Sequence, residues 1–594
     1  MKTWFTFFAL ALLLNLNPTE TMAQLSKLIL PFEQDNNTTS TYFQAIDFYQ
    51  ALAAQFPQQL ELREIGQTDS GLPLHLLILS TSKTFDPDSA RAAGKQILFI
   101  NNAIHPGEPC GVDASMMLLR DLLLDKERQA QLERLIIVVV PFYNIGGGLN
   151  RGSFSRANQN GPQAYGFRGN ARNLDLNRDF VKCDSHNARA FNQAFARWQP
   201  DVFIDTHTSN GADYQYTMTL IPTQSDKLDP QLSEYLDGRL LPRLYKDMKA
   251  AGWEMTPYVN ARETPDEGIA AFLDLPRYSS GYAALHNTIG FMPETHMLKP
   301  YADRVRSTYA FIDCVIRAMQ EDQAALQQAR QQARDNTLSK DTFNIKWSLD
   351  PSQADTILFK GYEAKYKPSE VSGLSRLYYD RSAPYEKDIP YYRTYKTTTR
   401  VRKPMAYLIP QAYTEVVERL QWNGVKMKRL TEDVEIDLDF YYIDAYETVE
   451  SPYEGHYLHF GVKTNTKHLR RLFRKGDFVV YTDQPTNRYI VETLEPEAPD
   501  SFFAWNFFDG ILMQKEYYSA YVFEGLAAEL LRDDPELQVK LEQKRQADEK
   551  FAQSARAQLN FIYENSPYYE PTYRLYPVGR LMEPVDLPEE EGDY

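Results

Sequence analysis

The stretch Ile97-Leu98-Phe99-Ile100 is typical of a buried strand, and His105-Pro106-Gly107-Glu108 follows it, ahead of a helical pattern over residues 112–124. A turn between a strand and a helix is a place where a rigid scaffold exposes functional side chains. The imidazole and the carboxylate in this turn are ligand types that zinc accepts. Four residues alone are a weak signal, so the hypothesis of a metal site depends on partners elsewhere in the chain.

Further aliphatic runs alternate with helical patterns in the first half of the chain. The runs cover residues 74–79, 135–140 and 202–205, and helices are predicted at residues 41–56 and 301–334. Near-continuous apolar strands that alternate with helices are typical of a sheet buried on both faces. We therefore predict an α/β fold, with helices on each side of a central sheet.

Composition divides the chain into three segments. Residues 1–23 place Lys2 before an apolar run and a small-residue site ahead of Gln24, which is the pattern of a secretory signal peptide. This apolar run is too short for a membrane span. Residues 24–335 contain the α/β pattern, and residues 341–594 are rich in tyrosine and mix strand-like with helical stretches. We predict a secreted or periplasmic protein without a membrane anchor, whose C-terminal α+β region has an unknown role.

Charge and cysteine content exclude other classes. The 594 residues carry a formal net charge of −16 and no long basic run, which argues against nucleic acid as a partner. The three cysteines, Cys110, Cys183 and Cys314, have no Cys-x-x-Cys spacing, so a structural zinc cluster is not expected. We expect them to be buried as small apolar residues, with one disulfide left open as an alternative. The oligomeric state cannot be inferred from the sequence.

A second histidine completes a ligand set. His207 follows the strand predicted at residues 202–205, at the carboxyl edge where open α/β sheets bind ligands. Together with His105 and Glu108, it would supply the two imidazoles and one carboxylate of a catalytic zinc that keeps one position for water. Glu294, at the end of another strand-like run, can act as general base beside such a water.

Several separated motifs, taken in order, resemble the zinc metallocarboxypeptidases, peptidase family M14. The motifs are His105-Pro106-Gly107-Glu108, the segment Asp175-Leu176-Asn177-Arg178-Asp179-Phe180, the strand-end His207 and the later Glu294. The resemblance spans about residues 46–334. It implies a mixed central sheet flanked by helices, one Zn²⁺ per chain, and a peptide substrate with a free C-terminal carboxylate.

The resemblance also implies a role for each residue of these motifs. His105, Glu108 and His207 would bind zinc, and Glu294 would be the base and later the proton donor. Asn177 and Arg178 would hold the terminal carboxylate of the substrate, a task that suits a guanidinium. Arg168 would polarise the scissile carbonyl, and Asp175 would orient His105.

The tyrosine that caps the substrate in this family has two candidates in the sequence, Tyr278 and Tyr282. The spacing to Glu294 is shorter than in the family for both of them, and we predict Tyr282. The preference for the side chain of the released residue is left open.

Three other functions are compatible with the same scaffold. A cell-wall peptide amidase or carboxypeptidase would use the same zinc site, and some of the 39 tyrosines could bind glycan-linked peptides. An N-acyl amino acid deacylase would tend to show His-Gly-x-Glu, so His105-Pro106-Gly107-Glu108 favours the peptidase. An inactive binding protein would be expected to lack a ligand or the base, and the sequence lacks neither.

Overall fold

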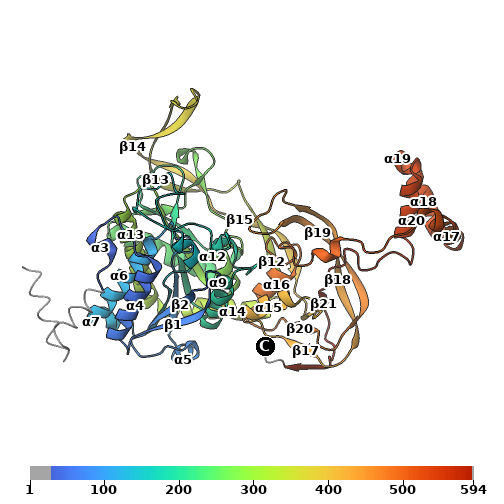
Figure 1. Cartoon of the computed structure of the whole chain (residues 1–594), viewed down its shortest axis with the longest axis horizontal. Helices are drawn as coiled ribbons and strands as arrows, with labels where there is room; N and C mark the ends of the chain where they lie inside the picture. Colours follow the sequence, from blue (N-terminus) through green and yellow to red (C-terminus); the bar gives the residue numbers. More distant parts are fainter. Residues whose placement is uncertain (1–27, 592–594) are drawn as a thin grey trace, which may run out of the picture.

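The structure is a computed structural model in which residues 28–591 are described (Figure 1). The predicted signal peptide, residues 1–23, lies outside the described residues. None of the helices in residues 28–591 combines the length and the hydrophobicity needed to cross a lipid bilayer.

The N-terminal half is built on a mixed sheet that has nine strands in the described part of the chain. In sheet order they are β1 (Leu60–Gln67), β2 (Pro73–Leu79), β4 (Leu135–Val140), β3 (Gln96–Asn101), β5 (Val202–Asp205), β11 (Ile289–His296), β7 (Met218–Pro222) and β8 (Met255–Pro257), with β6 (His207–Ser209) also paired to β11. The central strands β4, β3, β5 and β11 are parallel. The pairs β1–β2, β2–β4 and β7–β11 are antiparallel, and β8 runs parallel to β7. The mixed sheet agrees with the predicted fold class.

Both faces of this sheet are covered, because successive strand residues point to opposite sides. In β3, Leu98 and Ile100 belong to one buried cluster, and Ile97 and Phe99 to another. The first cluster is covered by α4 (Tyr42–Gln55), α6 (Cys110–Leu124), α10 (Pro230–Tyr235), α11 (Leu241–Ala250), α13 (Tyr301–Glu321) and α14 (Gln323–Ser339). The second is covered by α9 (His186–Trp198), α12 (Ser279–Leu285), α15 (Thr414–Trp422) and α16 (Asn487–Leu494). The predicted α/β fold, with helices on each side, is confirmed.

The C-terminal region has a sheet of its own, visible beside the first sheet in Figure 1. Its order is β19 (His459–Phe473), β18 (Val434–Thr448), β21 (Gly579–Leu581), β16 (Ala406–Ile409), β20 (Phe478–Tyr481), β17 (Lys428–Leu430) and β22 (Glu589–Glu591). Within this region, β16, α15 (Thr414–Trp422) and β17 form a strand–helix–strand unit over residues 406–430. The region is therefore α+β, as predicted.

Two parts project from the rest of the molecule in Figure 1. One is the long hairpin of β13 (Asp355–Pro368) and β14 (Ser375–Tyr392). Strand β14 also pairs with β10 (Ile269–Ala270), which pairs in turn with β9 (Asn260–Ala261). The other is a helical module with a small apolar cluster of its own, formed by α17 (Ala520–Asp533), α18 (Pro535–Ala547), α19 (Glu549–Ala552) and α20 (Ala555–Glu564).

The N-terminal half and the C-terminal region share one buried cluster. Phe99 of β3 and Tyr282 of α12 belong to the same cluster as Tyr407 of β16, Tyr489 of α16 and Trp505. Helix α14 ends at Ser339, and the next strand, β12 (Thr342–Leu349), pairs with β15 (Tyr395–Arg402). The division into residues 24–335 and 341–594 stays a prediction, because this hydrophobic core has no boundary there.

The cysteines follow the prediction for small buried residues. Cys110, Cys183 and Cys314 are buried, and none of them forms a disulfide.

Candidate active site

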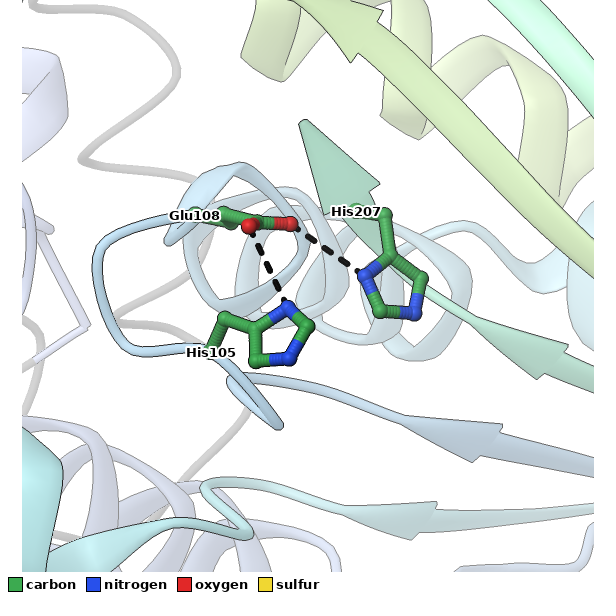
Figure 2. Close-up of side chains that lie close together, drawn as sticks. All are labelled: His105, Glu108 and His207. Carbon is green, nitrogen blue, oxygen red and sulfur yellow. Dashed lines mark hydrogen bonds and ion pairs between the residues drawn. The ribbon is translucent and has the colours of Figure 1, made fainter. Parts of the chain in front are cut away.

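Three side chains converge at the carboxyl edge of the central sheet (Figure 2). His105 and Glu108 lie in the turn between β3 and α6, and His207 begins β6. The Nδ1 atoms of His105 and His207 lie 3.2 Å from Glu108 Oε1 and Oε2, respectively. One ligand atom from each residue lies within 4.8 Å of the others, and all three side chains are buried. The structure thus brings together the three residues that the sequence predicts as zinc ligands.

The sheet register explains this convergence. Strands β3 and β5 run parallel with Asn101 opposite Asp205, so the loops that follow them leave the sheet side by side. In the same way, β11 runs parallel to β6 and pairs Glu294 with His207. Open α/β sheets bind ligands at the carboxyl ends of their strands, which is where these residues lie.

Each imidazole has its outer nitrogen bound to a carboxylate. His105 Nε2 donates to Asp175 Oδ1, and His207 Nε2 donates to Asp205 Oδ2, both at 2.9 Å. Such a bond fixes the tautomer and directs the other nitrogen, Nδ1, toward the centre of the site. The predicted pairing of Asp175 with His105 is observed, whereas sequence analysis gave Asp205 no role, although it lies two residues before the histidine at a strand end.

These contacts fit a metal cation. His105 Nδ1 is buried and has no hydrogen-bond partner among the described residues, although Glu108 lies nearby. A buried nitrogen without a partner is costly unless it meets a cation or a donor. Two neutral imidazole nitrogens and one carboxylate oxygen form the donor set of many catalytic zinc sites.

The electrostatics of the cluster also favour a cation. Burial raises the pKa of Glu108, but the charges of His105 and Arg156 outweigh it and hold the pKa well below its ordinary value. Burial opposes a charged His207, yet the neighbouring Asp205 carboxylate raises the pKa of this imidazole well above its ordinary value. An environment that stabilises a proton on buried imidazole would also stabilise a bound metal ion.

Glu294 lies beside the three candidate zinc ligands, and its environment differs from that of Glu108. It is partly exposed to the cavity, whereas Glu108 is buried. Burial raises the pKa of Glu294 to about 7; the charge of His207 opposes this shift and that of Glu108 adds to it. A carboxyl group with a pKa near neutrality can both accept and return a proton, which is what a general base and acid requires.

Two arginines flank the carboxylate of Glu108. Arg168 Nε donates to Asp175 Oδ2 at 2.9 Å, and its Nη1 lies 3.5 Å from Glu108 Oε1. Arg156 Nη2 donates to the same Oε1 at 2.7 Å. Sequence analysis missed Arg156, because it lies in a long segment without periodicity or a motif.

Asn177 and Arg178 lie together on another wall of the same cavity. Both belong to the short 3₁₀ helix Leu176–Arg178, and Asn177 Oδ1 accepts a hydrogen bond from the backbone N–H of Ser279 at 3.1 Å. The guanidinium carbon of Arg178 lies 4.4 Å from the centre of the Tyr278 ring. The guanidinium is therefore held against an aromatic face.

The prediction for Tyr282 is wrong. Its side chain is 0% exposed, its ring stacks on Phe180, and its hydroxyl donates to Asn423 Oδ1 at 2.6 Å. Tyr282 is in the second turn of α12, whose inner face packs into the core, whereas Tyr278 precedes the helix and lines the cavity. The other candidate, Tyr278, is therefore the one near Arg178.

With the exception of Tyr282, the residues predicted as zinc ligands, base and substrate-binding groups line one cavity of about 680 Å³. Its polar wall contains the two histidines, Glu108, Glu294, Asn177 and three arginines. Its less polar lining comprises Phe167, Ile221, Tyr258, Phe272, Tyr278, Met292 and Met297. A concave site of this size with a few convergent polar groups can hold a small peptide segment.

The cluster of two histidines and a glutamate, with a second carboxyl group beside it, defines a metal-dependent hydrolase. Residues 45–218 match the family described as zinc carboxypeptidase, peptidase M14. The match contains His105, Glu108, Arg168, Arg178 and His207. Tyr278 and Glu294 lie beyond its end.

Curated relatives agree with this class. Carboxypeptidase 2 of Trichophyton rubrum is 25% identical over 452 residues, which cover 72% of this chain and 76% of the relative. Carboxypeptidase 2 of Trichophyton equinum is 24% identical over 464 residues, covering 73% and 78%. Because the aligned share of this chain is larger than residues 1–340, both alignments must extend into the C-terminal region. The chain is thus similar to carboxypeptidases over most of its length.

Solved structures with partial similarity include two carboxypeptidases. The metallo-carboxypeptidase from Burkholderia cenocepacia is 17% identical, with a TM-score of 0.36, over 48% of this chain and 70% of that chain. Carboxypeptidase A from Helicoverpa armigera is 14% identical, with a TM-score of 0.37, over 48% and 74%.

Proposed function

We propose that this protein is a zinc-dependent carboxypeptidase that hydrolyses the last peptide bond of peptides with a free C-terminal carboxylate. The observation that carries the proposal is the position of Arg178 and Asn177 in the same cavity as His105, Glu108 and His207. A cation site beside a carboxylate-binding site suits cleavage at a chain end.

His105, Glu108 and His207 would hold the zinc ion, through the two Nδ1 atoms and the carboxylate. When bound, zinc supplies a Lewis acid that lowers the pKa of water and polarises a carbonyl group. Asp175 and Asp205 keep the imidazoles in the required tautomer and orientation.

Glu294 would act as the base. With its pKa raised to about 7 by burial, it would take a proton from the attacking water and return it to the leaving amine. Arg168 lines the cavity near Glu108 and would donate to the carbonyl oxygen of the scissile bond, where negative charge develops.

Arg178 would bind the terminal carboxylate of the substrate. A guanidinium presents donors in a fork that matches a carboxylate. Asn177 would add an amide N–H, because its Oδ1 is occupied by Ser279 and its Nδ2 is left for the ligand. Tyr278, against which Arg178 rests, would replace Tyr282 in covering the substrate.

Matched peptides with free or amidated C-termini test this function directly. We expect mass spectrometry to show release of the single C-terminal residue from the free acid, and kcat/KM at least about tenfold lower for the amide, because the amide lacks the charged partner of Arg178. Equal cleavage of both peptides would contradict the assignment of Arg178. Peptidoglycan fragments in the same assay would reveal a preference for cell-wall peptides.

We also propose that the protein is exported, on the basis of the signal-peptide pattern in residues 1–23. Expression of the full chain in a secreting host, followed by sequencing of the mature N-terminus, tests this. We expect Gln24 as the first residue in the extracytoplasmic fraction; an intact N-terminus in the cytoplasm would contradict export.

A further inference from the structure

A tight turn of the C-terminal region reaches the catalytic half. It connects β18 with β19 and is closed by two backbone hydrogen bonds, from Tyr453 N to His456 O at 2.7 Å and from His456 N to Tyr453 O at 3.1 Å. Its two central residues, Glu454 and Gly455, have φ values of 52° and 85°. Two successive residues of positive φ make a compact two-residue turn, which suits a glycine at the second position.

The first contact of this turn is with Arg178. Arg178 Nε donates to Tyr453 Oη at 2.9 Å, although the two residues are 275 positions apart in the sequence. Nη1 of the same guanidinium donates to the carbonyl oxygen of Asn177 at 2.7 Å. These two bonds, together with the Tyr278 ring, fix the plane of the guanidinium, and Nη2 has no hydrogen-bond partner among the described residues.

The second contact is with the backbone that carries Arg178. Glu454 Oε2 accepts a hydrogen bond from the N–H of Asp175 at 2.7 Å. The carboxylate of Asp175, in turn, binds His105 on one oxygen and Arg168 on the other. The turn therefore contacts both ends of the segment that connects the histidine site with the arginine.

The turn is itself anchored. His456 Nε2 lies 2.7 Å from Asp184 Oδ2, and the Tyr453 ring stacks on the buried Trp505, with centroids 6.1 Å apart and ring planes 17° apart. Arg277 lies over both rings and is paired with Asp500 at 2.8 Å. Because the ring of Tyr453 cannot shift easily, its hydroxyl is a fixed acceptor for Arg178.

We propose that Tyr453 is a positioning residue that orients Arg178 for the terminal carboxylate, and that the C-terminal region is thereby part of the substrate-binding machinery. This inference depends on the proposed role of Arg178. Tyr453 acts through Arg178 and does not line the catalytic cavity itself.

The variant Tyr453→Phe in the full-length chain tests the inference, because phenylalanine keeps the ring that stacks on Trp505 and removes only the hydroxyl. We expect KM for a free-acid peptide to rise about tenfold, since one hydrogen bond to a charged group is lost, and kcat to change by less than about twofold. KM for the matched amide should stay unchanged. Tyr457→Phe, an exposed tyrosine four residues later, is the control and should behave like the wild type. A wild-type KM in Tyr453→Phe would overturn the inference.

A double-mutant cycle separates this inference from the proposed function. In an Arg178→Ala background, adding Tyr453→Phe should cause no further change in KM, because the hydroxyl has lost its partner. If Arg178→Ala alone keeps a wild-type KM for the free acid, the proposed role of Arg178 is wrong. If Arg178→Ala raises KM and Tyr453→Phe does not, only the role of Tyr453 is wrong. An equal additional loss in the Arg178→Ala background would show that Tyr453 acts by another route and would also overturn the inference.

Discussion

Asp175 links His105 to Arg168. Its Oδ1 accepts a hydrogen bond from His105 Nε2, and its Oδ2 accepts one from Arg168 Nε, each at 2.9 Å. One carboxylate therefore orients both a metal-ligand candidate and the arginine that would meet the scissile carbonyl. The charges of these partners outweigh the effect of burial and keep the pKa of Asp175 well below its ordinary value.

The variant Asp175→Asn should weaken metal binding. The neutral amide keeps the shape but cannot accept from both partners, so we expect zinc affinity to fall about 10- to 100-fold, as for other groups behind metal ligands. Chelator competition measures the affinity. Asp47→Asn, an exposed position in α4, is the matched control. Unchanged affinity in Asp175→Asn would contradict the orienting role.

The variant Glu294→Gln should abolish turnover and keep the metal. Glutamine preserves the volume but cannot accept a proton, so we expect kcat to fall by about 10²- to 10⁴-fold. Elemental analysis should find the same zinc content as in the wild type. Glu234→Gln, at an exposed position in α10, should be fully active. Comparable activity in Glu294→Gln would remove this residue from the role of base.

The released residue should be apolar rather than basic. Ile221, Phe272 and Met292 line the cavity, and its cationic side chains include Arg156, Arg168 and Arg178. Apart from Glu108 and Glu294, which have the proposed roles of metal ligand and base, no carboxylate lines the cavity to pair with a lysine side chain, so burying that charge there would be costly. In otherwise identical peptides, we expect C-terminal leucine to be released at least about tenfold faster than C-terminal lysine, measured as kcat/KM. A faster release of lysine would refute this preference.

Stability should fall in acid through His286, which packs against Tyr282 and Tyr489 in the core. Burial lowers the pKa of this imidazole to about 3, and the charge of Arg330 acts in the same direction. The unfolded chain takes up the proton near pH 6.5, so the contribution to stability is complete above about pH 6.5 and is lost progressively as the pH falls toward about 3.

The variant His286→Phe checks this pH dependence by urea unfolding. Between pH 7 and pH 4.5, we expect the free energy of unfolding of the wild type to fall by about 2 kcal/mol more than that of the variant. His468→Gln, at an exposed position in β19, should keep the wild-type pH dependence. Parallel curves for the wild type and His286→Phe would show that His286 does not titrate on unfolding.

Much of the fold could be predicted because the strands β2, β3, β4 and β5 of the central sheet are locally apolar. The run over residues 135–140 is β4 itself, the run at 74–79 lacks only the first residue of β2, and the run at 97–100 lacks one residue at each end of β3. The helix predicted over residues 301–334 is in fact two helices, α13 and α14, which meet at Asp322. Periodicity cannot reveal such a break when both helices continue the same pattern.

The site could be predicted only in part, for a similar reason. His105, Glu108 and His207 stand directly after strands, so the sheet topology brings them together. Tyr282 was chosen by its spacing from Glu294, and spacing does not show which face of a short helix packs into the core. The contacts of Tyr453 depend on a turn 275 positions away from Arg178, and no local pattern predicts such a pair.

The buried cluster continues from the central sheet into the C-terminal region, so the chain cannot be divided between the two without exposing core residues. A fragment that ended after α14 would expose the face of the central sheet that α15 and α16 cover. It would also lack the turn that contains Tyr453, the hydrogen-bond partner of Arg178. The smallest portion suited to crystallisation or engineering is therefore almost the whole chain. The module α17–α20, which has a separate apolar cluster, is the one segment whose excision the described core would tolerate.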